Sequence, residues 1–221
     1  MPRLFIFFSL LLLGCHRTKT VVWSRYKSGK VQDQFTFDVN AGRDTTGLLK
    51  SFFSNGKVEV IGRLQNGRKE GHWIQFTHAG DTVFSGVFKN GLLTGDVFEK
   101  LPNGWRKVHY LADKKEGRCI EFQHWEFKKD VHTYFYQVGQ FHDDKPIGLW
   151  IRKDTNGIIM AENTYVDGIV RGYFTNRYAN GNIKLKGVLN IDSAGTNRFD
   201  FYDESGHKKK LKGYEIDLVK P

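Results

Sequence analysis

The sequence predicts an all-β protein, an elongated single-layer antiparallel β-meander built from about seven hairpin repeats of about 24 residues each. Three observations support this prediction. Turn-forming pairs such as Asn-Gly recur at a fixed period, apolar residues alternate with polar ones between the turns, and no stretch shows the capped 3.6-residue periodicity of an amphipathic helix. Such a period is typical of repeat proteins, in which each unit packs mainly against its neighbours.

The clearest pair of repeats lies in residues 51–100. Counted from the glycine of its first turn, each unit has Gly at +6, an apolar residue at +8, Asn-Gly at +10 and +11, Gly at +15 and an aromatic or apolar residue at +17. Asn-Gly favours type I′ hairpin turns, which need positive φ at both central residues. Two such turns per unit predict two strands per unit, or about 12–14 strands in the chain. The signals of the first unit are Asn55-Gly56, Gly62, Leu64, Asn66-Gly67, Gly71 and Trp73, and those of the second run from Ala79-Gly80 to Val97, 24 residues later.

The same spacing can be followed through residues 22–221, which we take as one repeat domain. In the third unit, counted from Gly104, Tyr110 and Ala112 hold the +6 and +8 places and Cys119 takes the place of the Trp. The rhythm then breaks in residues 123–133, where five residues are inserted and residues 128–130 are the expected turn. Because the insertion breaks the repeat, we expect a function specific to this protein to lie there first.

The N-terminus predicts a secreted, lipid-anchored protein. Residues 1–14 read as a signal peptide, because the ten-residue apolar run from Leu4 to Leu13 is too short to span a bilayer, which needs about 20 residues. The end of this run, residues 12–15, resembles the lipobox of bacterial lipoproteins. The resemblance implies cleavage before Cys15 and acylation of Cys15, and His16 in place of Asp implies the outer membrane. The alternatives are an ordinary cleaved signal and a buried N-terminal strand or helix. Residues 15–21 are expected to form a short tether.

The repeats themselves resemble MORN repeats, and among them the bacterial variant known as the YwqK-type antitoxin repeat. The resemblance rests on the run from Gly62 to Trp73, GRLQNGRKEGHW, and is repeated more loosely from Asp144 to Trp150. It implies stacked hairpins. It implies no active site, since these repeats carry none.

The composition indicates a class of partner, whereas no motif in the sequence indicates a chemical reaction. The chain has 34 basic and 24 acidic residues, a net charge of +10, which favours an anionic lipid or glycan contact or simply a solvated basic surface. The secretory signal argues against nucleic acid. No spaced nucleophile–base motif, phosphate loop or Cys/His metal spacing occurs, so we expect no catalytic residues, no metal and no cofactor. Four histidines crowd the irregular region, but they are expected on different strands: His109, His124, His132 and His142.

Six aromatic residues are the candidate binding residues. Trp73, Trp150 and Phe174 share the +17 place, whereas Phe88, Phe141 and Tyr165 share the +8 place. They could form a structural ladder that holds a single-layer sheet together, in which case those at +17 are largely buried. Alternatively, part of the ladder is an exposed groove for a partner strand, peptide or glycan.

These patterns lead to two hypotheses of function. The first is a non-enzymatic envelope lipoprotein whose repeat sheet is a binding scaffold for a protein or another envelope component. The second follows from the resemblance, an antitoxin or immunity protein that neutralises a toxin by direct binding.

Overall fold

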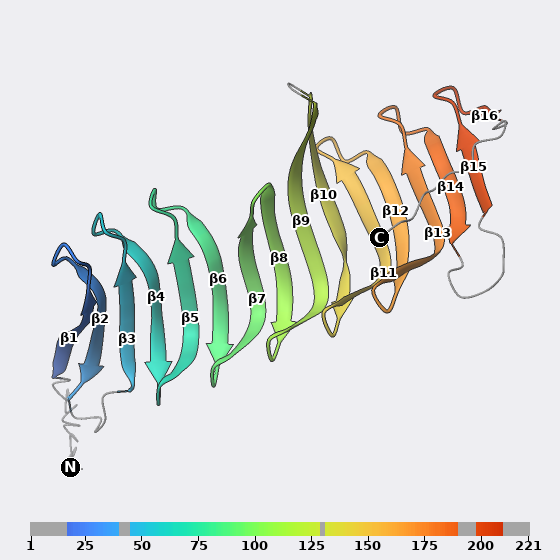
Figure 1. Cartoon of the computed structure of the whole chain (residues 1–221). Coiled ribbons are helices and arrows are strands. Elements are labelled where there is room, and N and C mark those ends of the chain that lie inside the picture. The colour runs from blue at the N-terminus through green and yellow to red at the C-terminus, as the bar shows by residue number, and fades with distance from the viewer. Residues whose placement is uncertain (1–16, 40–44, 129–130, 190–197, 210–221) are drawn as a thin grey trace, which may run out of the picture.

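The described part of the chain forms a single antiparallel sheet. The computed structural model describes residues 17–39, 45–128, 131–189 and 198–209. These residues form 16 strands in sequential order, so that each strand pairs with the one before it and the one after it, and they include no helix (Figure 1). The predicted single-layer β-meander is therefore confirmed.

The sheet has more strands than the 12–14 expected, because both ends of the repeat also pair. β1 begins at Thr18, so part of the expected tether already lies in the sheet. The strands are β1 (Thr18–Arg25), β2 (Val31–Asp38), β3 (Gly47–Phe52), β4 (Val58–Gln65), β5 (Arg68–Phe76), β6 (Thr82–Lys89), β7 (Leu92–Leu101), β8 (Gly104–Leu111), β9 (Lys114–Lys128), β10 (Val131–His142), β11 (Lys145–Asp154), β12 (Ile159–Val166), β13 (Ile169–Arg177), β14 (Ile183–Leu189), β15 (Arg198–Tyr202) and β16 (Lys208–Lys209).

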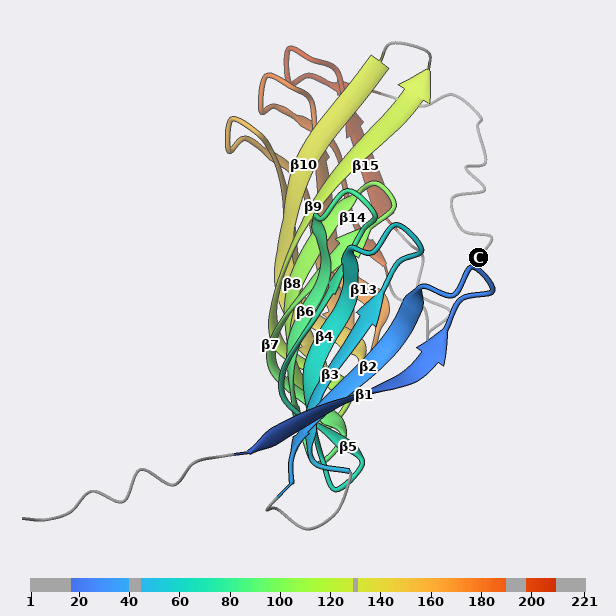
Figure 2. The same ribbon diagram turned by 90° about the vertical axis from the view of Figure 1, so that its left-hand side faces the viewer.

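Neither face of the sheet is covered by a second layer of described residues (Figures 1 and 2). Figure 2 shows the twist that is usual in antiparallel sheets, with β1 and β2 inclined to the strands that follow. A sheet of this kind must bury its apolar side chains against one another on its own surface, which makes the packing between neighbouring strands decisive.

The two long edges of the sheet use different turns. At one edge both central residues have positive φ, as at Asn66-Gly67 (51° and 76°), which is the expected type I′ turn. At the other edge only the glycine has positive φ, as at Gly56 (86°), and a longer connection is closed by the hydrogen bond that Gly56 N–H donates to Phe53 C=O at 2.8 Å. Among the described residues, the type I′ expectation holds for the second turns at 66–67, 90–91, 112–113, 143–144 and 167–168, and it is wrong for first turns such as that at Gly56.

The glycines at +6 and +15 together allow the Trp at +17 to pack against the neighbouring strand. The pairing of β4 with β5 is interrupted at Gly62, and the bulge opposite contains Gly71 with φ of 68°. This bulge brings Trp73 onto Gly62, where a Cβ would lie 2.0 Å from the indole ring. The same arrangement recurs in the β10–β11 hairpin, where a Cβ on Gly139 would lie 2.1 Å from Trp150.

In the third unit the structure corrects the assignment of Tyr110 and Ala112. Tyr110 pairs with Lys115 as Leu64 pairs with Lys69, so Tyr110 holds the +8 place and Val108 the +6 place. Ala112 lies in the type I′ turn, with φ of 49°. The count from Gly104 was too long because β7 and β8 are joined by only two residues, 102 and 103. The assignment of Cys119 to the place of the Trp is confirmed by the same register.

The insertion lengthens a hairpin. β9 and β10 are the two longest strands described, with 15 and 12 residues, and their hairpin rises above its neighbours in Figure 1. The chain reverses between Lys128 and Val131, where the displaced turn was predicted. The extra residues therefore extend two paired strands and do not form a separate loop.

The core lies on one face of the sheet, which we call the packed face. Its central cluster consists of Val97, Val108, Tyr110, Cys119 and Trp150, supported by half-buried apolar neighbours. Among the +17 aromatics, Trp73 and Trp150 are each 4% exposed and Phe174 is 8% exposed, so the predicted burial of these residues is confirmed.

Candidate binding face

The six aromatic residues predicted from the sequence lie on the packed face, and the sheet brings them into small groups. Trp150 contacts Phe141 and Tyr165 edge to face, with ring centroids 5.2 and 5.9 Å apart. Trp73 contacts Phe88 in the same way at 6.2 Å. Phe174 contacts Phe199 of β15, with ring centroids 5.6 Å apart. Because such pairs stabilise beyond the area they bury, these contacts fit the structural ladder.

Lysine side chains cover the ladder from the solvent side. Lys69 Nζ lies 4.8 Å from the ring centroid of Trp73 and 4.7 Å from that of Phe88, and Lys115 Nζ lies 5.4 Å from the ring of Phe141. The lysine stems shield the rings while their ammonium groups stay in water. The ladder thus offers a partner little uncovered ring surface.

A second set of aromatic side chains, which sequence reasoning missed, lies on the opposite face. We call this set the aromatic stripe. It runs across four neighbouring strands, and successive rings are close, with centroids 6.4, 6.0 and 5.0 Å apart from β7 to β10. Tyr134 and Tyr136 are 45% and 38% exposed. The stripe consists of Phe98 on β7, Trp105 on β8, Phe122 on β9, and Tyr134 and Tyr136 on β10.

The long hairpin supplies most of the stripe. Phe122 pairs directly with both Trp105 and Tyr136, which places the three rings in one row across the sheet. Tyr134 lies one step further along β10 and stacks on His124 of β9, with ring centroids 4.8 Å apart. The aromatic row therefore reaches the part of the hairpin that the insertion lengthens.

A local signal for the stripe is present in the sequence. Tyr134, Phe135 and Tyr136 are consecutive, and in a strand their side chains alternate between the two faces. Phe135 is 2% exposed on the packed face, so the two tyrosines must point to the other face. In β10 the unbroken aromatic run, and not the 24-residue template, marks a strand that is apolar on both faces.

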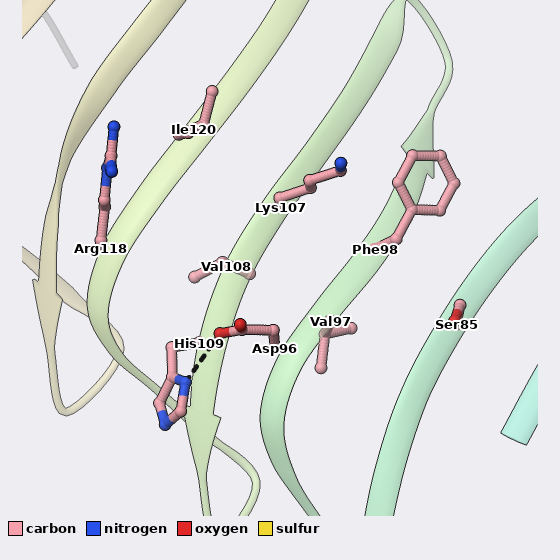
Figure 3. Close-up of a pocket in the computed structure, with 9 residues that line it drawn as sticks. All are labelled: Ser85, Asp96, Val97, Phe98, Lys107, Val108, His109, Arg118 and Ile120. Atoms are coloured by element: carbon pink, nitrogen blue, oxygen red, sulfur yellow. Dashed lines mark hydrogen bonds and ion pairs between the residues drawn. The ribbon is translucent and has the colours of Figure 1, made fainter. Parts of the chain in front are cut away.

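A depression of about 450 Å³ adjoins the stripe on the same face (Figure 3). Phe98 belongs to both. Lys107, Arg118 and Ile120 also line the depression, and Figure 3 shows these three on neighbouring strands. Aromatic, aliphatic and cationic side chains thus meet in one recess.

The charge in the depression is positive. Its one carboxylate, Asp96, is paired with His109, whose Nδ1 lies 2.9 Å from Asp96 Oδ1. Within the described ranges, neither Lys107 nor Arg118 forms an ion pair with a carboxylate. Two cations are therefore left without a protein counter-charge beside the aromatic row.

Further lysines flank the stripe. Lys107 Nζ lies 5.7 Å from the ring centroid of Trp105, and Lys100 pairs with Trp105 across β7 and β8. Lys153 of β11 pairs with Tyr136. The stripe is consequently bordered by positive charge on both sides, which favours an anionic partner.

The buried ionisable groups of the packed face are held in their protonated forms. Burial raises the pKa of the Cys119 thiol to about 12, and the thiolate is the form that would act as a nucleophile. Burial, followed by the hydrogen bond that its hydroxyl donates to Glu99 at 2.9 Å, raises the pKa of Tyr110. Glu99 also accepts a hydrogen bond from Arg106 Nε at 2.9 Å, so this group is part of a structural network.

The histidines of the irregular region are dispersed, as their strands require. His109 pairs with Asp96, His142 Nδ1 lies 3.0 Å from Glu116 Oε1, and His124 stacks on Tyr134. The side chain of His132 lies outside the part that the structure describes. Across residues 17–39, 45–128, 131–189 and 198–209, no three His, Cys, Asp or Glu side chains converge to hold a metal ion.

The sequence matches no protein-family model, and a search of curated proteins found no match. Among the residues that the structure describes, no helix is long and apolar enough to cross a membrane. Cys15 and the rest of residues 1–16 lie outside the described residues.

Proposed function

We propose that this protein is a non-enzymatic, lipid-anchored scaffold of the bacterial cell envelope, which binds a protein partner through the aromatic stripe. The observation that carries the proposal is the exposure of Tyr134 and Tyr136 at the end of a continuous aromatic row. The cores of protein interfaces are enriched in Tyr, Trp, Phe and Arg, and a few such residues supply most of the binding energy.

The two faces of the sheet use their aromatic side chains differently, and this difference supports the proposal. The packed face uses its aromatics for stability, as the 4% exposure of Trp73 and Trp150 indicates. The stripe contributes no residue to the buried core, and its strands are already held by hydrogen bonds and by the packing on the other side. A row of large rings on the exposed face is thus available for a partner.

The anchor would hold this face close to the membrane. β1 begins three residues after Cys15, a distance of at most roughly 10 Å in an extended chain. Acyl chains on Cys15 would keep the sheet at the bilayer surface, because each buried methylene stabilises by about 0.8 kcal/mol. We infer the outer membrane from His16 in the lipobox resemblance.

The test is capture of a partner from native membranes with the tagged protein and two variants. The double variant Tyr134→Ser/Tyr136→Ser should lose at least tenfold of any specifically captured protein. The control Val22→Ser/Leu48→Ser removes comparably exposed apolar side chains (41% and 37%) on β1 and β3 and should capture normally. Equal capture by both variants, each with an unchanged melting temperature, would contradict the proposal.

A further inference from the structure

We propose that the partner presents an acidic, extended polypeptide segment, whose carboxylates pair with Lys107 and Arg118 in the depression while its alternate apolar side chains lie on the aromatic stripe. This inference rests on the proposed function and adds to it the chemistry of the segment that is recognised.

The spacing of the rings suits an extended chain. Side chains on one side of an extended segment recur about every 6.6 Å, twice the rise per residue of a strand. Successive ring centroids from Phe98 to Trp105 and from Trp105 to Phe122 are 6.4 and 6.0 Å apart. The next step, from Phe122 to Tyr136, is shorter at 5.0 Å. A segment that crosses the strands along the stripe can therefore place every second side chain near Phe98, Trp105 and Phe122.

The charges determine which segment is favoured. Lys107 and Arg118 have no carboxylate partner among the described residues, and the depression's own carboxylate, Asp96, is engaged by His109. Carboxylates of the partner would supply the missing counter-charges, and an Arg guanidinium can hold a carboxylate through two parallel hydrogen bonds.

Position favours a narrow chain over a bilayer as the anionic partner. A membrane surface is broad and attracts cations that are spread over an extended area. Here Lys107 and Arg118 line a depression of about 450 Å³, together with Phe98 and Ile120 (Figure 3). Lys107 and Arg118 are both exposed, and a single polypeptide segment that lies in the depression can contact both cations and the ring of Phe98 together.

The experiment uses the full chain purified in detergent and three fluorescent ten-residue peptides. All three have Ser at every second position, so that the side chains between the Ser residues face one side of the extended peptide. In the first peptide these positions hold three Leu followed by two Glu, in the second Lys replaces Glu, and in the third Gly replaces Leu. Fluorescence anisotropy should show that the Glu/Leu peptide binds at least tenfold more tightly than either of the others. Raising the salt concentration should weaken its binding, because the contact includes ion pairs.

Charge reversal gives the sharper arm of the test. Lys107→Glu/Arg118→Glu should reverse the preference, so that the Lys/Leu peptide binds more tightly than the Glu/Leu peptide. The control Arg63→Glu/Lys184→Glu changes the net charge equally, and its side chains are exposed on β4 and β14, away from the depression. This control should keep the wild-type preference.

Three results would overturn the inference: no preference for the Glu/Leu peptide, the same preference after reversal at 107 and 118, or binding to phosphatidylglycerol vesicles in place of the peptide. Partner capture separates this failure from that of the proposed function. If Tyr134→Ser/Tyr136→Ser abolishes capture but Lys107→Glu/Arg118→Glu does not, the scaffold stands and the acidic segment is wrong.

Discussion

Trp73 lies against Gly62 so closely that a Cβ on the glycine would be 2.0 Å from Cδ2 and 2.3 Å from Cε2 of the indole. Trp150 and Gly139 repeat this contact at 2.1 and 2.2 Å. In the third unit, where Cys119 replaces the Trp, Val108 replaces the glycine, and both side chains are buried. In the third unit, volume lost on one strand of the hairpin is thus regained on the other, in keeping with close packing.

Substitution of Gly62 by Ala should lower the free energy of unfolding by about 2–3 kcal/mol, because the added methyl group overpacks the site. The effect should be much smaller in a Trp73→Val background, where the ring is absent. Urea unfolding of the two single variants and the double variant measures the coupling, which we expect to exceed about 1 kcal/mol. Additive effects would show that the Gly–Trp contact does not govern packing.

The Cys119 thiol should be inert in the native protein. It is 0% exposed, and burial raises its pKa to about 12, so almost no thiolate is present at neutral pH. In a Cys15→Ala background, which leaves one thiol, a disulfide reagent should react only after the protein is unfolded with denaturant. Rapid reaction under native conditions at pH 8 would show that the buried Cys119 side chain becomes accessible to solvent, which would contradict this prediction.

The pair of His142 and Glu116 should give a local pH dependence. The hydrogen bond from His142 lowers the pKa of Glu116, helped by the backbone N–H of Asp143, and the same side-chain bond raises the pKa of His142. The contribution of Glu116 is lost as pH falls through its lowered pKa, and that of His142 is lost as pH rises through its raised pKa. The pair therefore stabilises this edge of the sheet only at pH values between the lowered pKa of Glu116 and the raised pKa of His142. NMR titration should show the pKa of His142 falling toward its ordinary value in Glu116→Gln, and an unchanged value would contradict the pairing.

Acylation should depend on Cys15 alone. Metabolic labelling with an acyl-chain probe should label the wild-type protein, whereas Cys15→Ala should remain unlabelled and leave the membrane fraction. We expect this because Cys15 supplies both acylation sites, namely its sulfur and the amino group that cleavage creates. Absence of label on the wild type would remove the anchor from the proposed function.

The fold was predictable because its signals are local. Turn pairs such as Asn66-Gly67 and the alternation between them define hairpins without reference to distant residues. The third unit was misaligned because the short connection between β7 and β8 leaves no mark in the sequence pattern: Gly104 looks like the other turn glycines but lies in a strand. Counting residues from Gly104 therefore shifts the later positions of this unit by two, whereas the pairing of β8 with β9 assigns them correctly.

The aromatic stripe was harder to foresee for a physical reason. The repeat is imposed by the packed face, where Gly62 and Trp73 must fit together, so every position in the template belongs to that face. The template includes no position of the opposite face, although Ile74 and Phe98 repeat there 24 residues apart, each directly after a +17 residue. Tyr134 and Tyr136 are visible in the sequence only as neighbours of a core residue, Phe135, and their meeting with Trp105 and Phe122 depends on strand register.

The most direct test of the binding face is photo-cross-linking at one position on each face of the sheet. A photoreactive phenylalanine in place of Tyr134 lies on the stripe, and the same residue in place of the exposed Gln75 of β5 lies on the packed face. Irradiation of cells that produce each variant at equal levels is followed by detection of adducts. The stripe position should yield a discrete cross-linked product and the Gln75 position none. A product from Gln75 alone, or from neither position, would contradict the assignment of the stripe as the binding face.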